Sequence, residues 1–256
     1  MDTKVYFIGA GPGDPELITV KGQRLIREAD LVLYAGSLVP AAIVEQAKSD
    51  ATVQDSSGMT LEAMVEAMAA TVEKGGRVAR VHTGDPSIYG AIREQAALLE
   101  ERGITTGTIP GVTSAMACAA AAQRSFTVPE QTQTLIITRM AGRTPVPEKE
   151  SLEKLASHNS AMAIYLSATL VDDMQEKLRT GGYAEDTTIA IGYRVGWPEE
   201  KIFQTTLKGL VDTVRENELT RQTMFLILPG QHASLEETRS LLYAGHFSHG
   251  YRNKSE

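Results

Sequence analysis

The segment GAGPGDPELIT at residues 9–19 constrains this chain more than any other. It follows a short apolar run, VYFI at residues 5–8, and leads into a helical pattern over residues 17–28. A strand that ends in glycines and continues into a helix is the typical shape of a loop that holds a phosphate, so a dinucleotide-binding fold is the first hypothesis. The glycines allow this loop to bring its backbone close to another group.

Three residues argue against a dinucleotide. The G-x-G-x-x-G pattern needs a third glycine at the position of Asp14, whose carboxylate would repel a pyrophosphate. Pro12 removes one of the N–H groups that would hold the phosphates. Asp30 lies at the beginning of the second predicted strand, whereas an acid that binds a ribose lies at the far end. A dinucleotide-dependent oxidoreductase stays as an alternative, which calorimetry with NAD(P) would test.

The first half of the chain alternates strands with helices. Apolar and amphipathic patterns predict strands at residues 4–10, 30–35, 52–54, 78–81 and 105–109, with helices at residues 17–28, 40–47, 60–74 and 91–102 and from residue 114. Two more strands end in loops, TGDP at residues 83–86 and PGVTS at residues 110–114. The carboxyl ends of parallel strands share one edge, where ligands bind, so three such loops favour a binding site over ordinary turns.

The second half restarts after a polar stretch at residues 124–134, which we interpret as a linker. Strands are predicted at residues 135–138, 161–166, 188–194, 201–207 and 224–228, with helices near residues 150–157, 170–180 and 210–218. Consecutive strands without a helix between them indicate a mixed sheet. We predict two α/β domains, residues 1–123 and 124–256, each with a mixed or mostly parallel sheet flanked by helices, and an active-site cleft between them. Residues 246–256 are expected to form a tail.

Composition excludes several classes of protein. The formal net charge of −7 argues against a general nucleic-acid-binding role. Cys118 is the only cysteine, so no internal disulfide is possible, and its alanine-rich surroundings predict a small buried residue. No stretch of 18 apolar residues and no signal-peptide pattern is present, so we expect a cytoplasmic protein without a membrane segment.

The candidate chemical groups are few, and no metal site is predicted. Only two histidines are close in sequence and no acidic or cysteine cluster accompanies them, so surface or tail positions are expected for His82, His158, His232, His246 and His249. Asp85 precedes a proline, and it either forms a turn or binds a ligand. Thr113 and Ser114 lie at the start of a predicted helix, so their hydroxyl groups either cap the helix or contact a ligand. Arg139 and Arg143 are either solvated or bind carboxylates as a pair.

Taken together, the segments at residues 9–19, 83–86 and 110–114 resemble the tetrapyrrole (corrin/porphyrin) methylase family in order and spacing. The resemblance covers nearly the whole chain. It implies a two-domain α/β homodimer that uses S-adenosylmethionine as methyl donor, releases S-adenosylhomocysteine and needs no metal. The branch that methylates uroporphyrinogen typically has an Asp-Arg pair after the tyrosine of the second strand, whereas AGSLV follows Tyr34 here.

Three other segments are similar to the branch that methylates C-11 of precorrin-4 in vitamin B12 synthesis: YAGSLV at residues 34–39, the loop at residues 138–147 and FSHGYR at residues 247–252. The resemblance therefore implies a precorrin substrate. The donor is expected to contact Pro12, Thr83, Gly84, Asp85, Ile88, Thr113 and Ser114. Leu166 and Tyr193, from the second domain, are also expected to contact the donor, because they follow strands that match those of the family.

Arg139 and Arg143, with Ser37, are expected to face the carboxylates of the acceptor. No catalytic side chain is assigned, because positioning of donor and acceptor can supply the rate of an in-line methyl transfer. Cobalt-precorrin-4 or another tetrapyrrole as the substrate, and a tetrapyrrole carrier without turnover, stay as alternatives.

Overall fold

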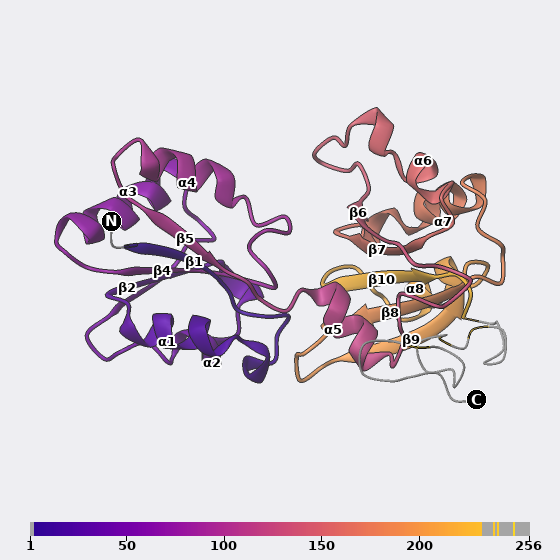
Figure 1. Ribbon diagram of the computed structural model, residues 1–256, viewed down its shortest axis with the longest axis horizontal. Coiled ribbons are helices and arrows are strands. Elements are labelled where there is room, and N and C mark those ends of the chain that lie inside the picture. Colours follow the sequence, from indigo (N-terminus) through magenta and orange to yellow (C-terminus); the bar gives the residue numbers. More distant parts are fainter. Residues whose placement is uncertain (1–2, 232–237, 239, 241–247, 249–256) are drawn as a thin grey trace. The chain divides into compact units, whose positions relative to one another are not determined.

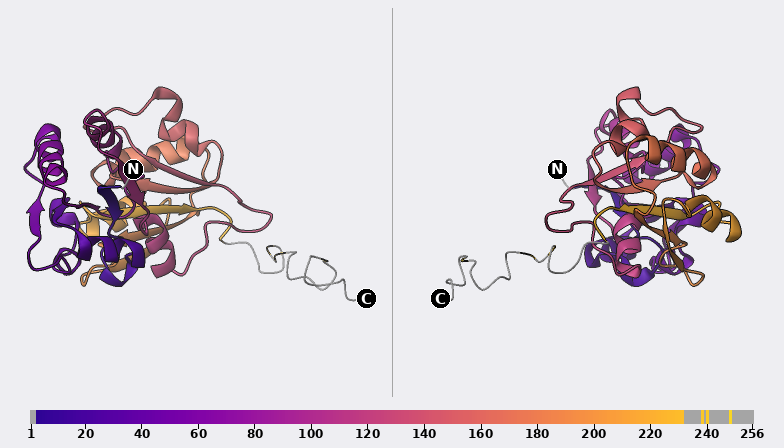
Figure 2. Two further views of the ribbon diagram at one scale, coloured as in Figure 1. Left: turned by 60° about the vertical axis from the view of Figure 1, so that its left-hand side comes forward. Right: turned by 90° about the vertical axis from the view of Figure 1, so that its right-hand side faces the viewer.

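The computed structural model describes residues 3–231, 238, 240 and 248. Contacts between residues divide the chain into two compact units, Met1–Ala117 with Val195–Pro198, and Cys118–Arg194 with Glu199–Glu256. The colours of Figures 1 and 2 run from indigo in the first unit to yellow in the last strand of the second. The tail predicted at residues 246–256, with its motif at residues 247–252, lies outside the described residues apart from residue 248.

The division at residue 117 falls inside helix α5 (Ser114–Ala121). The sequence places its domain boundary after this helix, between residues 123 and 124, and that position stays a prediction. The stretch at residues 124–134, interpreted as a linker, has no helix and only an isolated bridge between Val128 and Thr132.

The first unit contains one sheet of five parallel strands in the order β3-β2-β4-β1-β5. Its strands are β1 (Val5–Gly9), β2 (Leu31–Tyr34), β3 (Thr52–Asp55), β4 (Val78–His82) and β5 (Thr106–Ile109). The connections hold α1 (Val20–Glu28), α2 (Ala41–Val44), α3 (Leu61–Glu73) and α4 (Ile92–Glu100), and the short 3-10 turns η1 (Pro15–Leu17) and η2 (Gly36–Leu38). The predicted alternation of strands and helices is confirmed.

The helix predicted to begin at residue 17 begins one turn later, so that prediction is wrong at its start. Residues Pro15–Leu17 form the separate turn η1, and Thr19 is the N-cap of α1, its hydroxyl accepting from the N–H of Gly22 at 3.1 Å. A threonine at this position satisfies a helix N–H that has no partner within the helix. Thr60 caps α3 in the same way, accepting from Ala63 at 3.2 Å.

Both faces of the first sheet are buried. Helices α1 and α2 cover one face and α3 and α4 the other (Figure 1). Ile8 belongs to the core with α1, whereas its neighbour Phe7 belongs to the core with α3, because successive side chains of a strand point to opposite faces. A sheet covered twice explains why the inner strands β1 and β2 are apolar runs without polar alternation, whereas the edge strands β3 and β5 carry polar residues.

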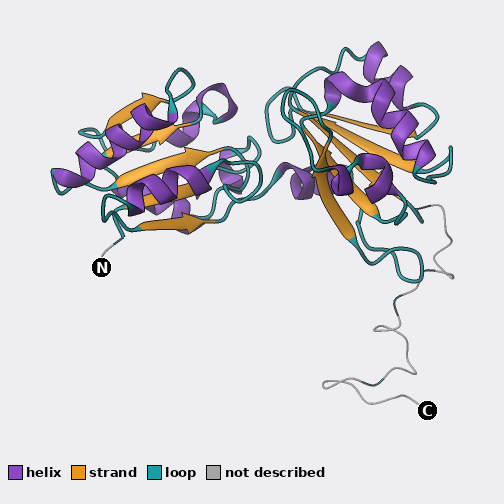
Figure 3. Ribbon diagram, turned by 90° about the horizontal axis from the view of Figure 1, so that it is seen from above, coloured by secondary structure: helices purple, strands orange, loops and turns teal. Residues whose placement is uncertain are grey.

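The second unit contains a mixed sheet in the order β6-β7-β10-β8-β9, as predicted from its consecutive strands. Its strands are β6 (Leu135–Arg139), β7 (Ala161–Tyr165), β8 (Thr188–Tyr193), β9 (Lys201–Thr206) and β10 (Thr223–Leu228). Its helices are α6 (Leu152–Ala156), α7 (Val171–Thr180) and α8 (Leu210–Glu216), and η3 (Glu148–Glu150) and η4 (Ala168–Leu170) are 3-10 turns. Only β6 and β7 are parallel neighbours, and Figure 3 shows helices beside both sheets.

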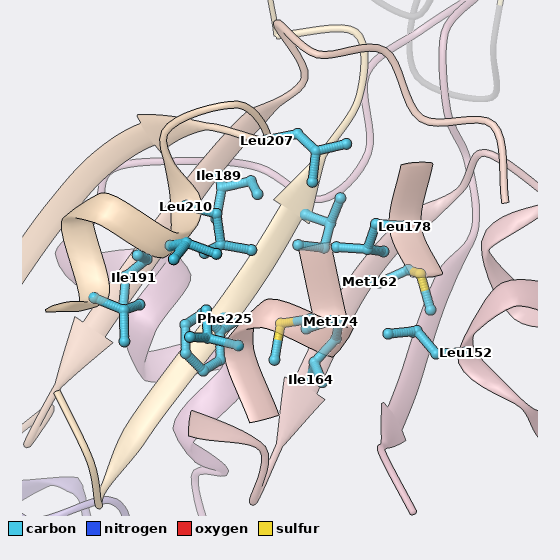
Figure 4. Packing of buried hydrophobic residues seen from close by; sticks show 14 of the residues in the cluster. Leu152, Met162, Ile164, Met174, Leu178, Ile189, Ile191, Leu207, Leu210 and Phe225 are labelled. Carbon is cyan, nitrogen blue, oxygen red and sulfur yellow. The ribbon is translucent and has the colours of Figure 1, made fainter. Parts of the chain in front are cut away.

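One large cluster of apolar side chains forms the core of the second unit (Figure 4). Phe225 on β10 lies among Ile164, Ile191 and Met174, and all four are fully buried. Alternate residues of β7, β8 and β10 supply the sheet side of this cluster, while α6, α7 and α8 supply the helix side. Truncation of such a phenylalanine to alanine typically costs about 3–5 kcal/mol, so this core is a main source of stability for the unit.

Candidate functional site

Three loops of the first unit meet at the carboxyl edge of its sheet. They follow β1, β4 and β5, which are neighbours in the sheet. A Cβ atom added to Gly9 would lie 2.5 Å from the carbonyl oxygen of Gly84 and 2.6 Å from the Cα atom of Gly111, and one added to Gly111 would lie 2.1 Å from the same oxygen. The loops therefore touch backbone to backbone, which only glycine permits.

Hydrogen bonds join the first two of these loops. Gly11 and Gly84 form an antiparallel bridge in which the N–H of Gly84 donates to the oxygen of Gly11 at 2.7 Å, and the N–H of Gly11 donates back at 3.3 Å. Ala10 donates to the oxygen of His82 at 2.8 Å. The loop after β1 is thus fixed along its length by the end of β4.

Asp85 connects the second loop to the third. Its Oδ1 atom accepts from the N–H of Ser87 at 2.8 Å, and its Oδ2 atom accepts from the N–H of Gly111 at 2.9 Å. The turn-forming role proposed for Asp85 is therefore present. Contact of this carboxylate with a ligand stays a prediction.

Asp14, which prevents a dinucleotide fingerprint, caps the turn that follows it. Its Oδ1 atom accepts from the N–H of Glu16 at 2.8 Å, and its carbonyl oxygen accepts from Leu17 at 3.0 Å. The side chain thus closes η1, a local role that explains an aspartate before a proline.

His82 corrects one expectation. The sequence predicts surface or tail histidines, but His82 is only 5% exposed, and its ring lies against Phe7 with centroids 5.9 Å apart. Its Nε2 atom has no hydrogen-bond partner among the described residues. Burial, and then the charge of Arg80, lower the pKa of His82 to about 3, so the imidazole is neutral at physiological pH. The histidine is buried because it ends a strand covered on both faces.

Arg80 is a buried cation two residues before His82 on the same strand. Its guanidinium donates to the side chain of Gln95 at 3.1 Å, to the hydroxyl of Ser56 at 2.9 Å and to the oxygen of Leu33 at 3.3 Å. Burial lowers its pKa to about 10, which leaves it charged at neutral pH. These bonds tie the ends of β2, β3 and β4 to α4.

The other residues predicted in this unit lie at the same edge. Thr83 follows β4, Thr113 precedes α5, Ser114 is the first residue of α5, and all three are half-buried. Ile88 is also half-buried, and its N–H donates to the carbonyl oxygen of Asp85 at 3.1 Å. Ser37 lies in η2, which follows β2. The fold therefore brings the predicted positions of the first unit to one sheet edge.

Sequence reasoning missed Trp197. Its Nε1 atom donates to the carbonyl oxygen of Pro12 at 3.1 Å, so it contacts the loop after β1 from a distant part of the chain. Pro12 is buried. One sequence feature could have identified this residue. The only tryptophan of the chain lies between two predicted strands, in the glycine-containing turn Gly196-Trp197-Pro198.

The predicted residues of the second unit share one edge of its sheet. Arg139 ends β6, Leu166 follows β7 and Tyr193 ends β8, and these three strands run in the same direction because β10 is antiparallel to both β7 and β8. Leu166 is 72% exposed and has a φ of +54°, which is rare for leucine and typical of strained functional loops. Tyr193 is partly buried against the core.

The two arginines proposed as a carboxylate-binding pair differ. Arg139 donates to the carbonyl oxygens of Met140 and Thr144 at 3.2 Å and of Pro145 at 2.8 Å, so it holds its own loop together. Arg143 is exposed and makes no hydrogen bond or ion pair to any residue in the described part of the chain. Of the pair, Arg143 is the side chain available for a ligand carboxylate.

Among the described residues, no three His, Cys, Asp or Glu side chains are grouped to hold a metal ion. A search of the same residues finds no helix of the length and apolar character that a bilayer crossing requires. Cys118 is fully buried as predicted, and burial, together with the nearby Glu200, raises the pKa of its thiol to about 12. Such a thiol is not a nucleophile at neutral pH.

Comparison with known proteins identifies relatives along nearly the whole chain. A model of the family described as Tetrapyrrole (Corrin/Porphyrin) Methylases matches residues 4–211. The cobalt-precorrin-4 C(11)-methyltransferase of Priestia megaterium is 48% identical over 259 residues, which cover 99% of this chain and 100% of that protein. The precorrin-4 C(11)-methyltransferase of Pseudomonas aeruginosa is 45% identical over 249 residues, 97% of this chain and 98% of that protein.

Among solved structures, the X-ray structure of a cobalt precorrin-4 methyltransferase is 48% identical and superposes with a TM-score of 0.86, covering 88% of this chain and 94% of that one. The predicted two-sheet α/β fold is thereby confirmed. The chain belongs to the tetrapyrrole (corrin/porphyrin) methylases.

Proposed function

We propose that this chain transfers a methyl group from S-adenosylmethionine to C-11 of precorrin-4 or of its cobalt form, in cobalamin biosynthesis. The observation that carries the proposal is identity of 45–48% over almost the full length of relatives with this activity. Two of those relatives are named for cobalt-precorrin-4 and one for precorrin-4, so the two substrates belong to one proposal.

The loops of the first unit fit a donor that carries no phosphate. Asp14 and Pro12 disfavour a pyrophosphate but do not oppose a sulfonium cation. The half-buried Gly84 and Gly111 leave backbone groups at the sheet edge, and the hydroxyls of Thr83, Thr113 and Ser114 lie at the same edge. These are the small polar groups that fix the orientation of an adenosine and an amino-acid end.

The bound donor supplies an electrophilic methyl group and leaves as S-adenosylhomocysteine. The protein's part is to hold donor and ring carbon in line, and well-oriented reactants gain about 7–11 kcal/mol in favourable cases. The rigid contacts of Gly9, Gly84 and Gly111 serve this purpose because they leave the loops little freedom. No single catalytic side chain is assigned.

We assign the acceptor's carboxylates to the second unit and to η2. Arg143 is the exposed arginine of the loop after β6, while Arg139 keeps the loop at residues 139–145 in shape. Ser37, in the first unit, belongs to the same proposed acceptor site, whereas Leu166 and Tyr193, at the sheet edge of the second unit, are proposed to contact the donor. A homodimer, a site without metal and a cytoplasmic location complete the proposal, and light scattering tests the first of these.

The test is mass spectrometry of precorrin-4 and of cobalt-precorrin-4 after incubation with the chain and S-adenosylmethionine. We expect a gain of one methyl group on at least one of them, and the preferred substrate identifies the route. Uroporphyrinogen III and reactions without donor are the controls. Binding of the tetrapyrroles without methyl transfer would instead support a carrier, and methylation of uroporphyrinogen alone would contradict the proposal.

A further inference from the structure

Trp197 lies in the turn between β8 and β9, and this turn is part of the first unit. Residues Val195–Pro198 are counted with the first unit, although the strands on either side belong to the second. Arg194 and Glu199 form an ion pair of 3.3 Å at the base of the turn. Gly196 has a φ of +81°, which favours glycine. The ion pair and the glycine therefore give this turn a defined conformation.

Two glycines make the contact of Trp197 with the loop after β1 possible. A Cβ atom on Gly13 would lie 2.4 Å from Cδ1 and 2.6 Å from Nε1 of Trp197. A Cβ atom on Gly196 would lie 2.7 Å from the backbone nitrogen of Asp14. Distances below 3 Å are not tolerated between such atoms, so a side chain at either glycine would separate the turn from the loop.

Besides the hydrogen bond from Ala10 to His82, the loop after β1 has three points of attachment. Gly9 lies against Gly111, Gly11 pairs with Gly84, and Pro12 accepts the hydrogen bond of Trp197. The first two attachments come from neighbouring strands of the same sheet. The third comes from a residue 185 positions away in sequence. Pro12 cannot donate a backbone hydrogen bond, so its carbonyl is the group through which this part of the loop is held.

We propose that Trp197 is a positioning residue for the methyl donor, which it serves by holding residues 12–14 in the conformation that binds the donor. The inference rests on the proposed function, because it assigns this loop to the donor. Trp197 acts through the loop and does not touch the reacting atoms. It therefore affects the binding of the donor and leaves the binding of the acceptor unchanged.

The test compares the whole wild-type chain with Trp197→Phe, which keeps an aromatic ring but lacks the N–H donor. Calorimetry with S-adenosylhomocysteine gives the affinity, and steady-state kinetics give KM for each substrate and kcat. We expect Trp197→Phe to weaken binding of S-adenosylhomocysteine and to raise KM for S-adenosylmethionine by up to about tenfold, the equivalent of one hydrogen bond of about 1.4 kcal/mol. KM for the tetrapyrrole and kcat at saturating donor should stay unchanged.

Gly13→Ala and Gly196→Ala keep the tryptophan but separate it from the loop, so both should weaken donor binding at least as much. Val214→Ala is the matched control, because Val214 is buried in the core of the second unit and is not part of this contact. It should lower the melting temperature and leave the affinity for S-adenosylhomocysteine unchanged. Since Trp197 is the only tryptophan, its emission should also change on titration of the wild type, with the calorimetric midpoint.

The outcomes separate the two proposals. If the wild type binds no S-adenosylhomocysteine, the proposed function is wrong. If the wild type binds it and Trp197→Phe and both glycine variants bind it equally well, the function stands and the positioning role is wrong. An equal loss of affinity in Val214→Ala at a matched loss of melting temperature would also overturn the role, because instability alone would then explain the effect.

Discussion

The two sheet edges that carry the predicted site residues are built differently. In the first unit, β4, β1 and β5 are adjacent and parallel, so three loops leave the same edge side by side. In the second unit, antiparallel β10 separates β7 from β8, so the loops that follow these two strands are not neighbours. The first edge is held by backbone contacts between glycines, and the second presents side chains such as Leu166 and Arg143.

Under the proposed function, this difference predicts that the two edges make different kinds of contact with the donor and the acceptor. Backbone groups packed against one another are rigid, which suits the small donor of constant shape in the proposed function. Exposed side chains at separated strand ends can cover a larger and more variable acceptor. We therefore expect substitutions at the first edge to affect stability and donor binding, whereas substitution of Arg143 at the second edge should affect acceptor binding.

The largest expected effect is that of Gly111→Ala at the first edge. The new Cβ would lie 2.1 Å from the carbonyl oxygen of Gly84, and neither backbone can move without breaking the contact with Gly9. We expect a loss of about 3 kcal/mol or more in the free energy of unfolding, measured by urea denaturation.

The matched variant at the second edge is Gly142→Ala, in the loop after β6. A Cβ there would meet only Leu170 at 3.6 Å, an ordinary contact. Its effect should stay within about 0.5 kcal/mol. Equal effects of the two substitutions would contradict the contrast between a rigid and an adaptable edge.

The second-largest expected effect is the dependence of the free energy of unfolding on pH that His82 causes. Its pKa is lowered by burial to about 3 from an ordinary value of 6.5, so the unfolded state takes up a proton at a higher pH than the folded state does. The contribution of the neutral His82 imidazole to the free energy of unfolding is fully present above about pH 6.5 and is lost as the pH falls toward 3. Between pH 7 and pH 5 we expect a loss of about 2 kcal/mol, measured by urea denaturation.

His82→Gln should reduce this acid sensitivity, because no imidazole is left to protonate. The control is His158→Gln, since His158 is exposed in the second unit and its removal should leave the pH dependence as in the wild type. An unchanged slope in His82→Gln would show that the buried imidazole is not responsible.

The smallest effect is expected from Arg143→Ala. Because Arg143 is exposed, its loss should leave the melting temperature unchanged and raise KM for the tetrapyrrole by up to about fivefold, the worth of one exposed ion pair. Arg139→Ala removes three hydrogen bonds within the loop and should cost about 1–2 kcal/mol of stability. Unchanged acceptor KM in both variants would remove the arginines from the proposed acceptor site.

The sequence alone predicts the order of strands and helices and most of their positions. Periodicity and glycine or proline punctuation are local signals, and they identify every strand of both sheets to within one or two residues. The helix start near residue 17 is an exception, because the apolar pattern does not reveal that Thr19 caps the helix. The motifs at residues 9–19, 83–86 and 110–114 also predict the family, which the comparisons confirm.

Only the tertiary structure decides which groups these loops meet. The sequence shows that Gly9, Gly11 and Gly13 permit close approach, but their neighbours, Gly111, Gly84 and Trp197, lie far away along the chain. Burial of His82 likewise depends on helices covering both faces of β4, which no local pattern encodes. Chemistry and local conformation follow from short segments of sequence, whereas contacts between distant segments exist only once the sheet has brought the strand ends together.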